Sequence, residues 1–300
     1  MVDAGSPTPA SGEAAQLMGN VVRFVNPRRH GDRADVTLLD TGARTSAYWG
    51  DPMHSRHVLL ESPALGRQVH LWCYGQFGPP VVVFPSAAGM AHEWDRHGML
   101  EVLAPLINGG RAKLYCPESN VSETWTAKDT PLAHRMRRHA AYERFVLETL
   151  VPFIREDCRW PTAPMTAIGC SLGGTYSALF ALKFPETFRQ ALCMSGRYLT
   201  TELTGGENSQ DLYFNNPLAF VAGMHGEALE RVRRNTHLTL VCGRGKWEEG
   251  CIEETIALGK LLRDKEIPGE TDIWGPDSRH DWDYWQKQAV MHLPRVLARL

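Results

Sequence analysis

The sequence predicts an α/β fold in which helices cover both faces of a mostly parallel β-sheet. Continuous apolar runs, such as Val-Val-Val-Phe at residues 81–84, are typical of strands that are buried on both faces. These runs alternate along the chain with longer stretches of helical periodicity, which indicates parallel strands joined by helices. A chain of 300 residues is compatible with one large domain of this class.

The N-terminal part of the chain differs from the rest. Residues 1–20 are rich in Gly, Ala, Ser and Pro and lack a hydrophobic period, so we expect a disordered tail ahead of a single domain over residues 21–300. Short β-prone pieces separated by turn residues follow this tail, and they predict an antiparallel edge of the sheet. These pieces are residues 21–25, 35–39, 57–61 and 68–74.

Beyond residue 80 the alternation of strands and helices is regular. The stretch 132–157 gives the clearest helical signal, because Tyr142, Val146, Leu150 and Phe153 fall on one face at near-helical spacing. The predicted interior strands are 81–84, 112–116, 165–170, 190–194, 238–242 and 271–274, and the predicted helices are about 94–107, 132–157, 172–184, 251–265 and 282–299.

One interval, residues 197–237, interrupts the alternation. It contains Gly205-Gly206 and Asn215-Asn216-Pro217, and only one short piece near 226–234 has helical character. The sequence therefore predicts an inserted lid within the single domain.

Charge and composition exclude several classes of protein. Lys and Arg number 32 against 34 Asp and Glu, and a net charge of −2 provides no positive field for a nucleic acid backbone. No apolar run approaches the roughly 18 residues of a membrane span. The seven cysteines are odd in number and mostly lie in apolar runs, as is typical of reduced, buried thiols. We therefore expect a cytoplasmic protein with no membrane or nucleic acid partner.

The motif that carries chemistry follows the predicted strand at 165–170. Residues 169–174 read Gly-Cys-Ser-Leu-Gly-Gly and lead into an apolar helix, so Ser171 has the Gly-x-Ser-x-Gly spacing of a nucleophile elbow in its strand-turn-helix setting. Small residues two before and two after the serine allow a tight turn, which exposes the hydroxyl. A Gly-rich turn built only for close packing is the structural alternative.

A serine hydroxyl needs a base, usually histidine, which a carboxylate orients. Of the four histidines that follow Ser171, only His280 comes just after a predicted buried strand and just before the final helix. His292 falls within that helix, and His237 precedes a strand. We therefore expect His280 to be the base.

The acid is expected in the loop after the strand at 238–242. Glu248 and Glu249 are adjacent there and would point in different directions, so only one of them can serve. Glu253 and Glu254, on the following helix, are weaker candidates. This reasoning leaves the choice between Glu248 and Glu249 open.

An oxyanion on the substrate carbonyl needs backbone donors that are already aimed at it. The N–H of Leu172, next to the nucleophile, is the first candidate. The second should come from the loop at residues 85–89, whose small residues permit close approach of the backbone to a ligand, and we expect Ala87 to supply it.

The elbow at 169–174, the stretch Tyr-Phe-Asn-Asn-Pro at 213–217 and the ending His-Asp-Trp-Asp-Tyr-Trp at 280–285 resemble one branch of the α/β-hydrolase superfamily. This branch includes esterase D-like enzymes, feruloyl esterases and mycolyltransferases. The resemblance covers roughly residues 60–300. It implies an α/β-hydrolase fold with Ser171 as nucleophile and His280 as base. It favours Glu249 as the acid, because the acid in esterase D-like loops stands just before a short apolar helix start.

The chain departs from that pattern at two places. The usual His-Gly after the first core strand is Pro85-Ser86 here, and the loop that bears the acid is longer. The resemblance implies a serine esterase that acts on a small-molecule ester through an acyl-enzyme, without a cofactor or a metal. An acyltransferase with the same acyl-enzyme and a non-catalytic binding protein on the same fold are the alternatives.

Overall fold

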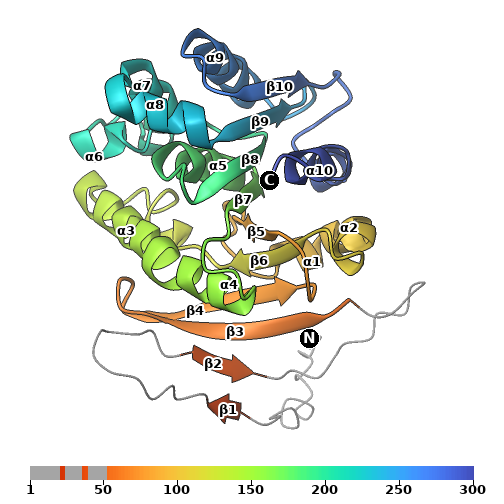
Figure 1. The fold of residues 1–300 in the computed structure, drawn as a ribbon. Coiled ribbons are helices and arrows are strands. Elements are labelled where there is room, and N and C mark those ends of the chain that lie inside the picture. The colour runs from red at the N-terminus through yellow and green to blue at the C-terminus, as the bar shows by residue number, and fades with distance from the viewer. Residues whose placement is uncertain (1–20, 24–35, 40–52) are drawn as a thin grey trace, which may run out of the picture.

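The computed structural model describes residues 21–23, 36–39 and 53–300, and a ten-stranded sheet forms its centre (Figure 1). The strands lie in the order β1-β2-β3-β4-β6-β5-β7-β8-β9-β10. The tail expected at residues 1–20 lies outside the described residues.

The first part of the sheet is antiparallel, as predicted. Each of the first four strands pairs with its neighbour in antiparallel register, and β4 continues antiparallel onto β6. These strands are β1 (Val21–Arg23), β2 (Val36–Leu39), β3 (Ser55–Ser62) and β4 (Arg67–Tyr74). In β3 and β4, buried residues alternate with more exposed ones, which is typical of a sheet with one covered face.

The other six strands are parallel, and each coincides with a predicted interior strand. Three of them, β5, β6 and β7, lie at the centre of the ten-stranded sheet and are buried at every position, because helices cover both faces of the sheet there. The six are β5 (Pro80–Val83), β6 (Lys113–Pro117), β7 (Met165–Cys170), β8 (Phe188–Met194), β9 (His237–Cys242) and β10 (Gly269–Ile273).

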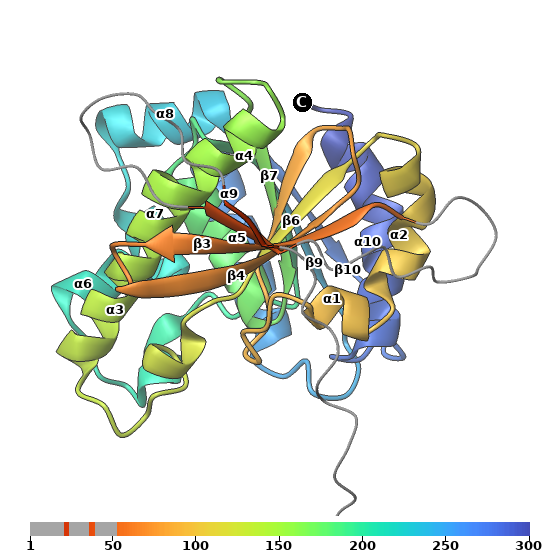
Figure 2. The same ribbon diagram turned by 90° about the horizontal axis from the view of Figure 1, so that it is seen from below.

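Helices lie on both faces of the parallel strands, as the view in Figure 2 shows. Helices α1, α2 and α10 cover one face, and their apolar side chains form one core with that side of the strands. The remaining long helices cover the other face and form the second, larger core. The helices are α1 (Glu93–Arg96), α2 (Met99–Asn108), α3 (Leu132–Phe145), α4 (Val151–Asp157), α5 (Leu172–Lys183), α9 (Cys251–Asp264) and α10 (Trp282–Leu297).

Two predicted helices are less regular than the sequence suggested. The single helix expected over 94–107 is divided into α1 and α2 at Gly98, whose φ of 68° lies in the left-handed region. The stretch 132–157 is helical throughout, but a π-helical turn, η2 (Val146–Leu150), separates α3 from α4. Pro152 follows this turn; it lacks an N–H and its ring crowds the preceding carbonyls, which the wider turn accommodates.

The expected insertion at 197–237 contains more helix than predicted. Besides α8 (Gly226–Asn235) it forms η3 (Thr200–Thr204), α6 (Gln210–Tyr213) and α7 (Pro217–Gly223). Side chains cap the two short helices: Ser209 accepts from the N–H of Leu212, and Asn216 accepts from the N–H of Ala219. Leu212 and Phe220 are buried in the larger core, so tertiary packing stabilises these helices. Each helix is too short to show a hydrophobic period in the sequence.

The register of the parallel strands brings their carboxyl ends together. Cys170 of β7 pairs with Met194 of β8, which in turn pairs with Val241 of β9, and Cys242 pairs with Ile273 of β10. The loops that follow these four strands therefore meet at one edge of the sheet, where ligands of open α/β sheets bind. The predicted functional residues all come from these loops or from the loop after β5.

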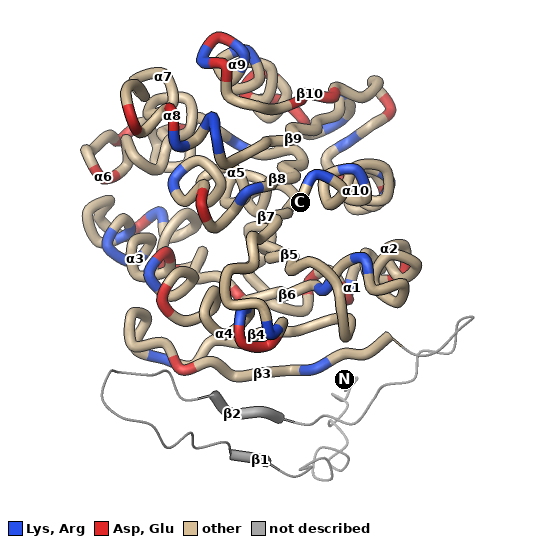
Figure 3. Tube along the Cα trace, viewed as in Figure 1, with Lys and Arg blue, Asp and Glu red and all other residues tan. Residues whose placement is uncertain are grey.

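Charged residues of both signs are mixed along the described part of the chain. Figure 3 shows basic and acidic positions interspersed along the helices, in keeping with the near balance of the two signs in the sequence. Among the described residues, no helix has both the length and the apolar character needed to cross a membrane.

Candidate active site

Ser171 occupies a strained turn between β7 and α5. Its φ of 55° and ψ of −126° are unusual for a residue with a side chain, and its N–H donates to the carbonyl of Met194 over 2.9 Å. Glycine is required at positions 169 and 173 because a side chain there would overlap neighbouring backbone atoms. A Cβ on Gly169 would lie 2.5 Å from the carbonyl carbon of Gly173, and one on Gly173 would lie 2.2 Å from the carbonyl oxygen of Phe84. The predicted elbow geometry is therefore present.

His280 faces Ser171 although 109 positions separate them in the chain. Its Nε2 lies 3.0 Å from the Ser171 Oγ, within hydrogen-bond distance. The backbone N–H of His280 donates to the carbonyl of Lys246, and the Trp285 ring packs edge-on against the imidazole at a centroid distance of 4.8 Å. These contacts fix the position of the ring.

The second nitrogen of His280 contacts Glu248. Oε2 of Glu248 lies 3.1 Å from Nδ1, and the Glu248 side chain is only 1% exposed. Burial alone would raise the pKa of Glu248, but hydrogen bonds with His280 and Ser195 outweigh burial and hold that pKa below its ordinary value. Glu248 is therefore a carboxylate at neutral pH, and it orients the imidazole.

The structure corrects the expectation that Glu249 stands beside His280. Glu249 is exposed, and no hydrogen bond in the described part of the chain joins it to His280. The backbone is the reason: Trp247 has a φ of 68°, and the chain then turns so that Glu248 points inward and the next residue points outward. The weaker candidate Glu254 is buried elsewhere, where it accepts from the N–H of Leu199 and pairs with Arg197.

The two expected oxyanion donors come from adjacent segments. Leu172 is the first residue of α5, so its N–H has no acceptor within the helix. The loop that carries Ala87 packs against the elbow through Phe84 and Gly173. Among the hydrogen bonds of the described residues, none uses the N–H of Ala87, whereas the N–H groups on either side of it are occupied.

Comparison with protein-family models matches residues 115–296, more than half of the chain, to the family described as "Putative esterase". The chain belongs to this esterase family. Family membership supports ester hydrolysis in general, and the matched residues include the elbow, the acid loop and His280. No curated protein sequence matches the chain.

Solved structures share the fold of this esterase-family protein at low sequence identity. A ferulic acid esterase is 16% identical with a TM-score of 0.66, and the match covers 83% of this chain and 99% of that one. An S-formylglutathione hydrolase from Agrobacterium tumefaciens is 14% identical with a TM-score of 0.65, covering 83% and 96%. A fluorophosphonate-binding serine hydrolase of Staphylococcus aureus is 14% identical with a TM-score of 0.61, covering 82% and 99%. These matches establish an α/β-hydrolase fold.

Sequence reasoning missed two residues that support the site of this esterase. Ser195, directly after β8, donates its hydroxyl to Oε1 of Glu248 over 2.7 Å. Glu93, at the start of α1 and 2% exposed, accepts from both the backbone N–H and the hydroxyl of Ser86. The position of Ser195 after a predicted parallel strand was a usable signal. No signal in the sequence showed that Glu93 points inward, because the polar segment around it resembles a solvated helix start.

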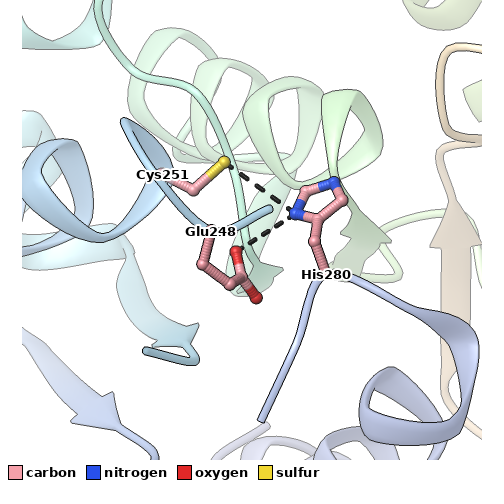
Figure 4. A group of neighbouring side chains, drawn as sticks. All are labelled: Glu248, Cys251 and His280. Atoms are coloured by element: carbon pink, nitrogen blue, oxygen red, sulfur yellow. Dashed lines mark hydrogen bonds and ion pairs between the residues drawn. The ribbon is translucent and has the colours of Figure 1, made fainter. Parts of the chain in front are cut away.

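A cysteine completes the surroundings of His280 in the esterase. The Sγ of Cys251, the first residue of α9, lies 3.9 Å from Nδ1 of His280, on the side that also faces Glu248 (Figure 4). Burial raises the pKa of Cys251 to about 12, so the thiol is protonated at neutral pH and is a poor nucleophile. Glu248, Cys251 and His280 are the one group in the described part of the chain whose ligand atoms are close enough to hold a metal ion.

Proposed function

We propose that this protein is a serine esterase that hydrolyses a carboxylic ester through an acyl-enzyme on Ser171. The observation that carries the proposal is the continuous contact from the Ser171 Oγ through His280 to Glu248, over distances of 3.0 and 3.1 Å. A hydroxyl, an imidazole and a carboxylate in this order are the groups that nucleophilic acyl transfer requires.

In the first half of the reaction, the Ser171 Oγ attacks the ester carbonyl carbon. His280 Nε2 accepts the hydroxyl proton, and Glu248 stabilises the imidazolium that forms through its contact with Nδ1. The tetrahedral intermediate then collapses, the bond from carbon to the alkoxy oxygen breaks, and His280 returns the proton to the departing alcohol. The acyl group remains on Ser171 as an ester.

In the second half, water takes the place of the alcohol. His280 Nε2 removes a proton from this water as it attacks the acyl carbon, and the proton then returns to the Ser171 Oγ as the carboxylic acid departs. Atoms balance without a cofactor or a redox step. An acyltransferase would use the same acyl-enzyme with an alcohol or sugar in place of water.

The negative oxygen of each tetrahedral intermediate needs preorganised donors. We assign these to the N–H groups of Leu172 and Ala87, each worth about 2.7–4 kcal/mol of barrier in comparable sites. The Glu93 carboxylate engages both polar groups of Ser86, and so fixes the peptide that precedes Ala87. This contact replaces the His-Gly that is usual at this point of the fold, and it makes Glu93 a positioning residue.

The segment 197–237 is proposed to cover one side of the substrate site. Its first residues are anchored by Glu254, which pairs with Arg197 and accepts from the N–H groups of Tyr198 and Leu199. The segment begins at the carboxyl end of β8, next to the loops that bear Glu248 and His280. Its helices therefore bound the space available to the acyl or alcohol group.

Hydrolysis of an activated short-chain ester by the wild type and by Ser171→Ala tests the proposal. We expect the variant to lose a factor on the order of 10⁶ in kcat, as removal of a serine nucleophile does in other triads. A fluorophosphonate probe should label the wild type at Ser171 and leave the variant unlabelled. Full turnover by Ser171→Ala, or folded wild type that neither turns over nor labels, would exclude the serine mechanism and favour a binding protein.

The same assay identifies the acyl acceptor and the substrate class. Structural neighbours include a ferulic acid esterase and S-formylglutathione hydrolases, so the panel should contain a feruloyl ester and a formyl thioester beside simple esters. An added alcohol or sugar that outcompetes water for the acyl group at millimolar concentration would indicate the acyltransferase.

A further inference from the structure

We propose that Glu248, Cys251 and His280 form an inhibitory binding site for a divalent cation with affinity for thiolate, for which Zn²⁺ is the best match. The effect on turnover rests on the function proposed above. The binding itself does not, because it depends only on the three side chains. The cation is a reversible inhibitor in this proposal and takes no part in the reaction.

The positions of the ligand atoms fit a tetrahedral ion. The Sγ of Cys251, Nδ1 of His280 and a carboxylate oxygen of Glu248 all lie within 4.8 Å of one another, with 3.9 Å between sulfur and nitrogen and 3.1 Å between nitrogen and oxygen. Zinc bonds of about 2.3 Å to sulfur and about 2.0–2.2 Å to nitrogen and oxygen place ligand atoms roughly 3.3–3.6 Å apart in a tetrahedron. The sulfur-to-nitrogen and nitrogen-to-oxygen distances differ from these separations by a few tenths of an ångström, and the sulfur-to-oxygen distance, which is at most 4.8 Å, would close by rotation of the Glu248 or Cys251 side chain.

The donor set selects the class of ion. One sulfur, one imidazole nitrogen and one carboxylate oxygen suit Zn²⁺ and similar transition metals, whereas Mg²⁺ and Ca²⁺ prefer sites made of oxygen alone. Three protein ligands leave the fourth tetrahedral position for water. A thiolate and a carboxylate together carry two negative charges, which balance a divalent ion in a buried place.

The burial of Glu248 and Cys251 and a hydrogen bond from Ser195 favour metal binding at this cluster. Glu248 and Cys251 are 1% and 4% exposed, while His280 is partly exposed and opens the cluster to solvent. Ser195 donates to Oε1 of Glu248 and so leaves Oε2 directed toward His280 and the thiol (Figure 4). Such a contact to a carboxylate ligand is the kind of outer-shell hydrogen bond that orients metal ligands.

Binding would stop catalysis by fixing the wrong tautomer of His280. The cation occupies the Nδ1 lone pair, so the single proton of the neutral imidazole must sit on Nε2, which faces Ser171. An Nε2–H can donate to the hydroxyl but cannot accept its proton. The Cys251 thiol loses its proton to solvent as the sulfur–metal bond forms, because a coordinating thiol is deprotonated by the ion. No oxidant or reductant is involved.

The first experiment is a titration of ester turnover with Zn²⁺ for the wild type, Cys251→Ser and Cys251→Ala, each normalised to its own rate in a metal-free buffer. We expect inhibition of the wild type that a chelator reverses. The Zn²⁺ concentration that halves turnover should be more than about 100-fold higher for both Cys251 variants than for the wild type. Loss of an outer-shell partner costs only roughly 10–100-fold in metal affinity, so a larger change indicates loss of a ligand. Cys158→Ser is the matched control, since this half-buried thiol contacts Tyr115 instead and its loss should leave the inhibition unchanged.

The second experiment measures binding without turnover. Co²⁺ added to folded Ser171→Ala should give the near-ultraviolet absorption of a cobalt–thiolate bond, and Ser171→Ala/Cys251→Ser should lack that band. A missing band in Ser171→Ala overturns the metal site whatever the ester assay shows. Equal inhibition of the wild type and Cys251→Ala by Zn²⁺ overturns it as well. Turnover by Ser171→Ala would overturn the serine mechanism, while the cobalt band would still report the site.

Discussion

The Ser195 hydroxyl donates a buried 2.7 Å hydrogen bond to Oε1 of Glu248, on the carboxylate oxygen that His280 does not use. The indole N–H of Trp285 donates to the same hydroxyl over 3.0 Å, so its proton is directed toward Glu248. Ser195 holds a φ of 50°, a conformation that costs energy for a residue with a side chain. The chain thus keeps a strained serine where it can orient the Glu248 carboxylate.

Ser195→Ala should lower kcat about tenfold with little change in KM, because one hydrogen bond to a charged group contributes about 1.5 kcal/mol or more. Steady-state kinetics on one ester measures both constants. Ser62→Ala is the control, since it removes a buried hydroxyl from β3, far along the sheet from the site. An equal fall in kcat for both variants would assign Ser195 a merely structural role.

The two adjacent glutamates provide a matched pair. Glu248→Gln keeps the volume of the side chain but removes the charge that stabilises the imidazolium of His280, so we expect kcat to fall by a factor on the order of 10⁴. Glu249→Gln changes an exposed side chain and should alter kcat by less than about threefold. The reverse ranking in the same assay would restore Glu249 as the acid.

Glu93 should act through the oxyanion loop. Glu93→Ala frees both polar groups of Ser86, and misplacement of the Ala87 N–H should reduce kcat by up to the roughly 10²–10³-fold that loss of one oxyanion donor costs. The variant should also lose affinity for a boronic acid, whose tetrahedral adduct needs the same donors. Asp95→Asn, an exposed change on the same helix, should leave both measurements unaltered. Normal boronate binding by a folded Glu93→Ala protein would contradict the positioning role.

Acid stability should depend on Glu143, which lies on α3 and pairs with Lys183 of α5. Burial alone would raise the pKa of Glu143, but its contacts with His139 and Lys183 outweigh burial and lower it from 4.5 to about 2. A carboxyl whose pKa is lower in the folded state stabilises the fold fully above its unfolded pKa, and this contribution is lost as the pH falls from about 4.5 to about 2.

Glu143→Gln should therefore destabilise the protein at neutral pH by an amount on the order of 2–3 kcal/mol and should flatten the acid limb of its stability curve. Urea unfolding at several pH values measures this change. Glu148→Gln, one turn further along the same stretch, replaces a carboxyl with no ion pair among the described residues and serves as the control. If the difference in unfolding free energy between the wild type and Glu143→Gln stayed the same from neutral pH to pH 2, the ion pair of Glu143 with Lys183 would not contribute to stability.

Most of the fold could be predicted from the chain alone. Strands buried on both faces must be apolar throughout, and the helices that cover them carry a 3.6-residue period, so β5 to β10 and the long helices were visible as patterns. The elbow was visible as well, because only glycine fits at 169 and 173, where a Cβ would overlap backbone atoms. Short helices such as α6 and α7 could not be predicted from the sequence, since they depend on caps and on burial against distant residues.

The sequence by itself determined the Gly-x-Ser-x-Gly turn at Ser171, the loop that contains Glu248 and Glu249 and the loop that contains His280, because each follows a recognisable strand. Only the tertiary structure decided which glutamate meets His280, since neighbours in a loop differ in direction and the positive φ of Trp247 sets that direction. It also brought Ser195, Glu93 and Cys251 to the site. Their roles arise from strand register and helix packing, which join residues far apart along the chain and leave no local pattern.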